Sequence, residues 1–124
     1  MVSKPMQRHV TVLYRYADRL ALGCVLAIGY LSLMPLVQLP DAPGNDKIHH
    51  LIAYAVLGFL AALSRKTRQT FQAVLLVVIA YGGLIEVIQP YVNRYGEVSD
   101  FLADAAGAVL GGLLAHGVSR FIRA

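Results

Sequence analysis

Charged side chains are scarce in this sequence: 11 basic and 7 acidic residues make up 15% of its 124 positions. Hydrophobic residues reach 57% instead, and the mean hydropathy is +0.59. A soluble chain of this length needs a polar face on most of its helices, and so few charges cannot supply one. The composition therefore excludes an ordinary soluble domain and favours a single membrane domain over residues 1–124.

Cysteine is almost absent as well, since Cys24 is the one thiol in the chain. This excludes a disulfide within the chain and a cysteine-based metal centre. The motifs of serine hydrolases (GxSxG), zinc peptidases (HExxH) and phosphate-binding loops are also missing. No motif therefore indicates a reaction, and the sequence predicts no cofactor and no resident metal.

The net charge of +4 does not indicate a nucleic-acid partner, although it is basic. The lysines and arginines are not interleaved with stacking aromatic residues, as they are in nucleic-acid-binding surfaces. They stand at the ends of apolar segments, where they can meet anionic lipid headgroups. The partner that the composition indicates is the lipid bilayer.

Four apolar runs are each close to the length that crosses about 30 Å of hydrocarbon. They cover about residues 20–36, 47–64, 71–89 and 101–122, and none carries a wide polar stripe. The connections between them are short, so successive spans must be antiparallel neighbours. The sequence therefore predicts an all-α, polytopic membrane protein that forms an antiparallel four-helix transmembrane bundle.

The basic residues predict the orientation of this bundle. Nine of the eleven lysines and arginines precede the first span, join the second to the third, or lie at the end of the fourth. Because cytoplasmic loops of membrane proteins are enriched in Lys and Arg, that side is expected to face the cytoplasm, together with both termini. The nine are Lys4, Arg8, Arg15, Arg19, Arg65, Lys66, Arg68, Arg120 and Arg123.

Polar residues gather at the opposite, extracytoplasmic mouth of the predicted bundle. They begin the second span, end the third, lie in the loop that follows, and begin the fourth, so an up-down topology brings them to one level. Ionisable groups at membrane depth are unfavourable and therefore indicate function by default. The predicted polar pocket comprises Asp46, Lys47, His50, Tyr54, Glu86, Gln89, Arg94, Asp100 and Asp104.

Helical spacing groups these residues into rows, because positions three or four apart share a helix face. Asp46, His50 and Tyr54 form one row. Asp100 and Asp104 form another, which continues into Gly107 and Gly111. Such small residues allow helices to pack closely in lipid, so this face is expected to point into the bundle.

Glu86 needs a partner, because it lies in the last turn of its span, where the helix dipole disfavours an acid. Arg94, Lys47 and His50 are the candidates, and Gln89 could complete the network. For the other acids, a structural role at a helix start is about as well supported as a function.

Two chemical alternatives stay open for these residues. A divalent metal bound by the histidine and the carboxylates is chemically reasonable, although no diagnostic spacing supports it. General acid–base hydrolysis of a lipid-linked or cell-wall substrate would use His50 with a carboxylate. The residues that either alternative would use are His50, Asp46, Glu86, Asp100 and Asp104.

The succession of DKIHHLIAYAVLGFL, GGLIEVIQ, NR and DFLADAAGAVLGG resembles the VanZ-like family of small bacterial membrane proteins. The resemblance covers about residues 46–112, and Asp104 stands where the family usually has Asn. It implies a multi-span protein of the bacterial envelope, and the founding member is linked to low-level teicoplanin resistance. It implies no reaction.

Three functions follow from the residues and the resemblance. The first is a membrane protein of the bacterial cytoplasmic membrane whose extracytoplasmic pocket binds a cell-wall or lipid-linked component, with a link to glycopeptide resistance. The second is a small intramembrane hydrolase or transferase. The third is a structural or partner-binding subunit in which the polar residues only hold the bundle together.

The orientation is testable with topology reporters. We expect alkaline phosphatase fused after Thr67 to be inactive and the same reporter fused after Asn93 to be active, because this enzyme folds only in an oxidising compartment. Enzyme activity at equal fusion abundance is the measurement. An active fusion after Thr67 would reverse the assigned topology.

Overall fold

The computed structural model describes residues 3–34, 46–64, 70–92 and 96–123. They form four α-helices, α1 (Lys4–Leu33), α2 (Asp46–Ser64), α3 (Phe71–Ile88) and α4 (Val98–Arg123), and a 3-10 turn η2 (Gln89–Val92) extends α3. All four helices are long and apolar enough to cross a membrane. The predicted all-α architecture with four membrane-spanning helices is therefore confirmed.

Local sequence signals mark where the helices begin. Ser3 caps α1 by accepting a hydrogen bond from the Met6 amide, and Pro5 follows in the first turn. Thr70 caps α3 in the same way, accepting from the Ala73 amide at 3.1 Å. The 18 residues of α3 would extend about 27 Å, close to the hydrocarbon thickness of a bilayer.

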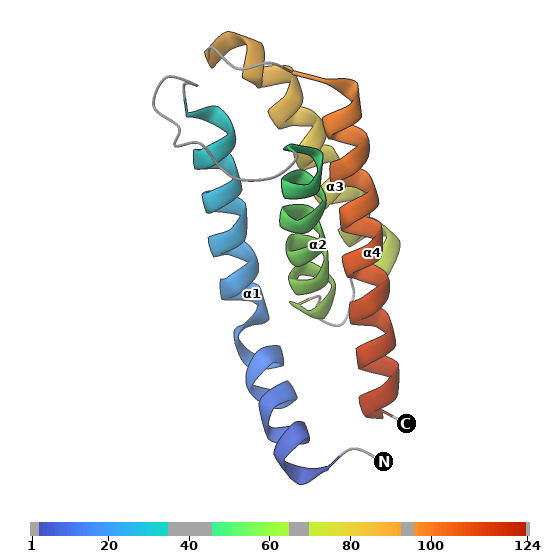
Figure 1. Ribbon diagram of the computed structural model, residues 1–124. Helices are drawn as coiled ribbons and strands as arrows, with labels where there is room; N and C mark the ends of the chain where they lie inside the picture. Colours follow the sequence, from blue (N-terminus) through green and yellow to red (C-terminus); the bar gives the residue numbers. More distant parts are fainter. Residues whose placement is uncertain (1–2, 35–45, 65–69, 93–95, 124) are drawn as a thin grey trace.

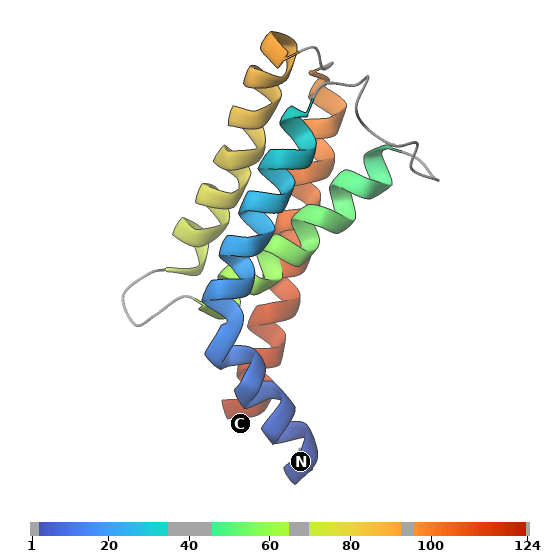
Figure 2. The same ribbon diagram turned by 90° about the vertical axis from the view of Figure 1, so that its left-hand side faces the viewer.

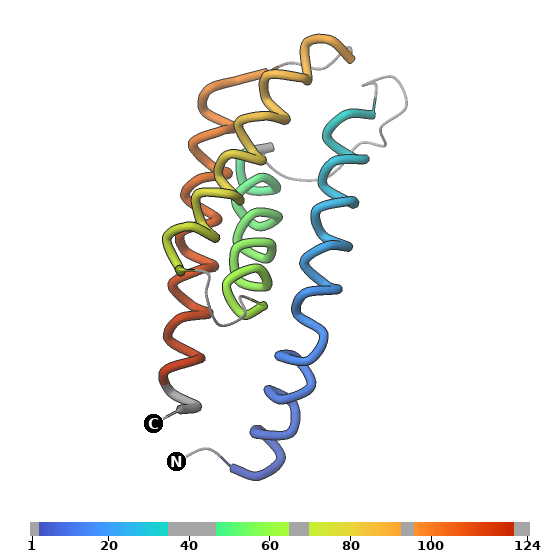
Figure 3. Tube along the Cα trace, turned by 180° about the vertical axis from the view of Figure 1, so that it is seen from behind, coloured from blue at the N-terminus to red at the C-terminus, as the bar shows by residue number. Residues whose placement is uncertain are grey.

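Each helix runs in the opposite direction to its predecessor, so the bundle is up-down (Figure 1). Seen from the side, α2 is inclined to the other helices (Figure 2). In the views from the front and from behind, α2 lies between α1 and α4 and contacts both (Figure 1, Figure 3). The beginnings of α2 and α4 and the end of α3 therefore lie toward the same end of the bundle.

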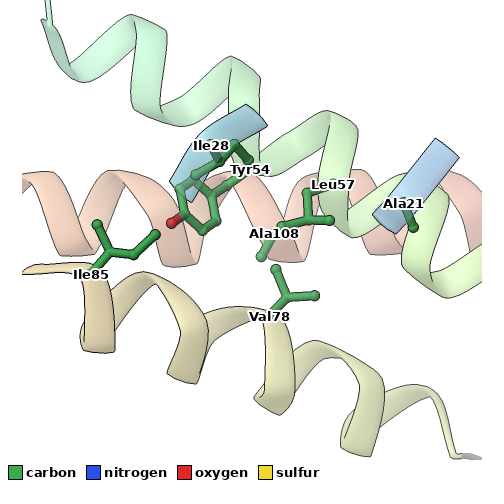
Figure 4. Close-up of a cluster of buried hydrophobic side chains, with 7 residues drawn as sticks. All are labelled: Ala21, Ile28, Tyr54, Leu57, Val78, Ile85 and Ala108. Atoms are coloured by element: carbon green, nitrogen blue, oxygen red, sulfur yellow. The ribbon is translucent and has the colours of Figure 1, made fainter. Parts of the chain in front are cut away.

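Most of the buried side chains of the bundle are apolar, and so are many of the exposed ones. Tyr54, Leu57, Val78, Ile85 and Ala108 belong to the main buried cluster (Figure 4). Many large apolar side chains point outward, for example Leu26, Leu76 and Leu114, each 65% exposed. Water would oppose such a surface, whereas lipid tails solvate it.

The helices α2 and α4 approach each other closely at glycine positions. A methyl group added at Gly107 would collide with the Leu51 carbonyl, and one added at Gly111 would collide with the Ala55 carbonyl. On the other side, a methyl group at Gly58 would lie 2.5 Å from the Ala108 carbonyl oxygen. The two backbones are therefore almost in contact along several turns.

Side-chain hydrogen bonds to main-chain carbonyls attach α1 to α3. The Tyr81 hydroxyl donates to the Val25 carbonyl at 2.5 Å, and the Gln89 amide nitrogen donates to the Ser32 carbonyl at 3.1 Å. Nearer the termini, the Tyr14 hydroxyl donates to the Ser119 hydroxyl of α4 at 2.6 Å. The first helix is thus joined to the bundle along its length.

The first helix is longer than the apolar run that predicts it. It begins at Lys4 and ends at Leu33, so the basic leader before residue 20 is part of the same helix. Its small side chains Ala17 and Ala21 pack into the core. The last residues of the predicted first span, 35–36, lie outside the described residues.

The glycine contact between α2 and α4 predicts the effect of a single methyl group. We expect Gly111→Ala to lower the free energy of unfolding by about 1–3 kcal/mol, because the new atom meets main-chain atoms that cannot rotate away. Gly117 of the same helix has open space around it, so Gly117→Ala should be neutral or stabilising by up to about 1 kcal/mol. Unfolding of both purified variants in detergent measures this, and equal stability would contradict the contact.

Candidate functional site

Side chains from three helices meet at the end of the bundle where α2 and α4 begin, here called the polar end. The described residues Lys47 and His50 lie on the first turns of α2, Glu86 on the last turn of α3, and Asp100 and Asp104 on the first turns of α4. Asp100 and Asp104 are 5% and 1% exposed, which is rare for carboxylates unless they are partnered. The burial of these acids marks the polar end as the chemical centre of the molecule.

His50 is held between the two aspartates of α4. Its Nδ1 lies 2.7 Å from Asp104 Oδ1, and its Nε2 lies 3.8 Å from Asp100 Oδ2. A distance of 2.7 Å is typical of a charge-assisted hydrogen bond. Both aspartates therefore orient one imidazole ring, because they are four residues apart on one helix face.

Lys47 forms the outer layer of the polar end. Its ammonium lies 3.2 Å from Glu97 Oε2 and 3.5 Å from Asp100 Oδ1. The hydrogen bond from Lys47 lowers the pKa of the Glu97 carboxyl, which lies just before α4 and is exposed. Glu97 therefore carries its charge at neutral pH and links the start of α2 to the start of α4.

Glu86 has a partner that its sequence position does not indicate. Its Oε2 accepts a hydrogen bond of 2.9 Å from the backbone amide of Glu97. The chain can come this close because residue 96 is glycine: a methyl group there would lie 2.7 Å from the Glu86 carbonyl oxygen. Of the expected cationic partners, Arg94 lies outside the described residues, and His50 offers a ring nitrogen within 4.8 Å of a Glu86 carboxylate oxygen.

Two buried oxygen atoms point at the space between α2, α3 and α4. The Tyr54 hydroxyl and Asp104 Oδ2 have no hydrogen-bond partner within the described part of the chain. Both side chains flank Gly82, where an added methyl group would be 3.1 Å from Asp104 Oδ2 and 3.2 Å from Tyr54 Cε1. Figure 4 shows the Tyr54 hydroxyl directed at α3. Buried polar atoms usually have partners, so these oxygens are candidates for binding a ligand.

Gln89 is buried but its amide nitrogen does not join this cluster. That nitrogen bonds to the Ser32 carbonyl of α1, while Oε1 has no partner in the described ranges. Gln89 is therefore an attachment point for α1 rather than a member of a network with Glu86.

Two residues of the predicted pocket are not fully described by the structure. Asp46 is the first residue of α2, and its side chain lies outside the described set. Arg94 lies wholly outside the described residues. Glu97 also belongs to the cluster, because its carboxylate lies 3.2 Å from the Lys47 ammonium and its backbone amide donates to Glu86.

A cavity of about 350 Å³ lies beside Glu86, between α3 and the start of α4. Apart from the two glutamates, its walls are apolar or glycine, and they include Val87, Pro90 and Phe101. A second cavity of about 380 Å³ lies among α1, α2 and α3 and is lined almost entirely by apolar side chains. The first cavity combines an apolar wall with a carboxylate, as binding sites for amphipathic molecules do.

His50, Glu86 and Asp104 come close enough together to act on one bound group. One ligand atom from each residue lies within 4.8 Å of the other two. An imidazole that is oriented by a carboxylate can accept or donate a proton, and two nearby carboxylates can accept hydrogen bonds. The chemical capacity of the polar end is therefore hydrogen bonding, proton transfer or cation binding.

Comparison with known proteins adds a family to this geometry. No curated protein and no solved structure gives a significant match. The family model described as VanZ/LLP1 matches residues 10–121, which include the polar end and most of each of the four helices. That span confirms the resemblance that the motifs carry. The chain is a membrane protein that belongs to the VanZ-like family.

Proposed function

We propose that the polar end is an extracytoplasmic pocket that binds a cell-wall or lipid-linked component of the bacterial envelope. The observation that carries the proposal is the convergence of His50, Glu86 and Asp104 from three helices, because one of them, Glu86, also lines a mostly apolar cavity. Carboxylates and an imidazole can accept hydrogen bonds from sugar hydroxyls, and the cavity can take part of an apolar carrier. A lipid-linked saccharide has both parts.

The proposed location is the cytoplasmic membrane of a bacterium, with both termini in the cytoplasm. The distribution of lysine and arginine supports this orientation, because the predominantly basic side lies away from the polar end. In this orientation the pocket opens where cell-wall precursors are exposed. A contribution to glycopeptide resistance, of the kind linked to the founding member of the family, would follow from binding such a precursor.

Single substitutions separate binding from folding. We expect His50→Gln, Glu86→Gln and Asp100→Asn each to weaken binding of a polyprenyl-diphosphate-linked disaccharide by about 10-fold or more, because each removes a charge-assisted hydrogen bond worth about 1.5–3 kcal/mol. Teicoplanin susceptibility of expressing cells should rise toward that of cells without the protein. Binding to the purified chain, susceptibility and protein abundance are measured together.

The neighbouring residue supplies the matched control. His49→Gln should leave binding and susceptibility unchanged, since His49 is not one of the three residues whose ligand atoms converge. If teicoplanin susceptibility rises only in variants whose protein abundance falls, the result favours the purely structural subunit. Unaltered binding in all three variants would end the proposal.

The His50–Asp104 pair favours hydrolysis as the second candidate function. An imidazole 2.7 Å from a buried carboxylate has the arrangement of an oriented general base. If the protein is a hydrolase, the purified chain should release phosphate or saccharide from the same polyprenyl-linked probe. His50→Gln should lower the rate of that release by about 100-fold or more. Equal turnover of the probe by the unsubstituted chain and the His50→Gln variant would exclude this role.

A further inference from the structure

Three side chains at the polar end offer a mixed nitrogen and oxygen ligand set. His50 comes from α2, Glu86 from α3 and Asp104 from α4, and one ligand atom of each lies within 4.8 Å of the others. Imidazole nitrogen and carboxylate oxygen are ordinary ligands of divalent transition metals. We propose that these three residues bind one divalent transition-metal ion, of which Zn²⁺ is the best match.

Unsatisfied oxygens in the same place support a cation. Asp104 is 1% exposed, and its Oδ2 has no hydrogen-bond partner among the described residues. Glu86 Oε1 is also buried without a hydrogen-bond partner among the described residues. The buried Tyr54 hydroxyl is directed at α3, the helix that carries Glu86 (Figure 4). A carboxylate oxygen without a donor is unfavourable in a low-dielectric interior, and a metal ion removes that penalty directly.

The charges of the polar end also favour a bound cation. Four carboxylates meet here, on Glu86, Glu97, Asp100 and Asp104. Among the described residues, the basic groups in contact with these carboxylates are the Lys47 ammonium and the His50 imidazole. Because charges buried near a bilayer must be compensated, a divalent ion restores the balance without protonating the buried acids.

The ligand types select the kind of metal. Mg²⁺ and Ca²⁺ prefer six or more oxygen ligands, whereas imidazole favours zinc and its first-row neighbours. Three protein ligands also leave a coordination position free, as in catalytic rather than structural zinc sites. That position could accept an oxygen atom of an anionic ligand, which an unneutralised cluster of carboxylates would repel.

Asp104 supplies the second carboxylate ligand and its negative charge. The metal site goes beyond the envelope-ligand pocket, because metal binding can be present whether or not a lipid-linked component binds. The two proposals can therefore fail separately.

Metal binding is tested on the purified full-length chain in detergent. After treatment with a chelator, the chain is incubated with Zn²⁺ alone, desalted and analysed for metal and protein content. We expect about one zinc per chain, together with a rise in the unfolding temperature that grows with Zn²⁺ concentration. Binding of Mn²⁺ should be weaker than that of Zn²⁺, and Mg²⁺ should not compete.

Ligand variants and matched controls identify the site. His50→Gln, Glu86→Gln and Asp104→Asn should each weaken Zn²⁺ affinity by more than about tenfold, whereas His49→Gln should retain it. The wild-type chain decides the outcome even if a variant fails to fold: wild type without zinc overturns the proposal. Zinc retained equally by the ligand variants, or displaced by Mg²⁺, also overturns it. A chain that binds zinc but no polyprenyl-linked probe would refute only the proposed pocket.

Discussion

The near-contact of the α2 and α4 backbones brings polar side chains of these two helices together at the polar end. Gly107 and Gly111 remove the side chains that would separate these helices, and Gly58 does so from the opposite helix. With the two axes so close, His50 comes within 2.7 Å of Asp104 and Lys47 within 3.5 Å of Asp100. The same contact that stabilises the bundle thus brings acids and bases together at its end. Without it, the first turns of α4 would carry two unpartnered carboxylates into lipid, which is strongly unfavourable.

Much of the fold can be predicted from the sequence, because lipid imposes a simple requirement. Each crossing must satisfy its own backbone hydrogen bonds, so a long uncharged run has to be a helix. The runs at 71–89 and 101–122 accordingly match α3 with η2, and α4, within a few residues. The first helix begins well before the predicted start of its span, because hydropathy detects only the apolar part of a helix. Nothing in the basic leader stops a helix after Pro5, and Ala17 has core contacts that keep that leader packed.

The candidate site is predictable to the extent that it depends on helical spacing. The rows of His50 with Tyr54 and of Asp100 with Asp104 follow from positions four apart, and the structure brings both rows together. What spacing cannot provide are contacts made by the main chain. Glu86 accepts a hydrogen bond from the backbone amide of Glu97. Because every residue except proline has such an amide, the identity of residue 97 does not predict this hydrogen bond. Gln89 likewise donates to a main-chain carbonyl of α1. Helical spacing does not predict that acceptor and instead predicts that Gln89 joins Glu86.

The attachment of α1 has an evolutionary consequence. Both of its acceptors, at Val25 and Ser32, are main-chain carbonyls, which persist whatever side chain stands at those positions. Specificity therefore resides in the donors, Tyr81 and Gln89, and in Gly29, whose lack of a side chain leaves room for the Tyr81 hydroxyl. The lipid-facing side chains of α1 can therefore be exchanged among apolar residues, whereas these donors, Gly29 and the Tyr14–Ser119 hydrogen bond keep α1 attached.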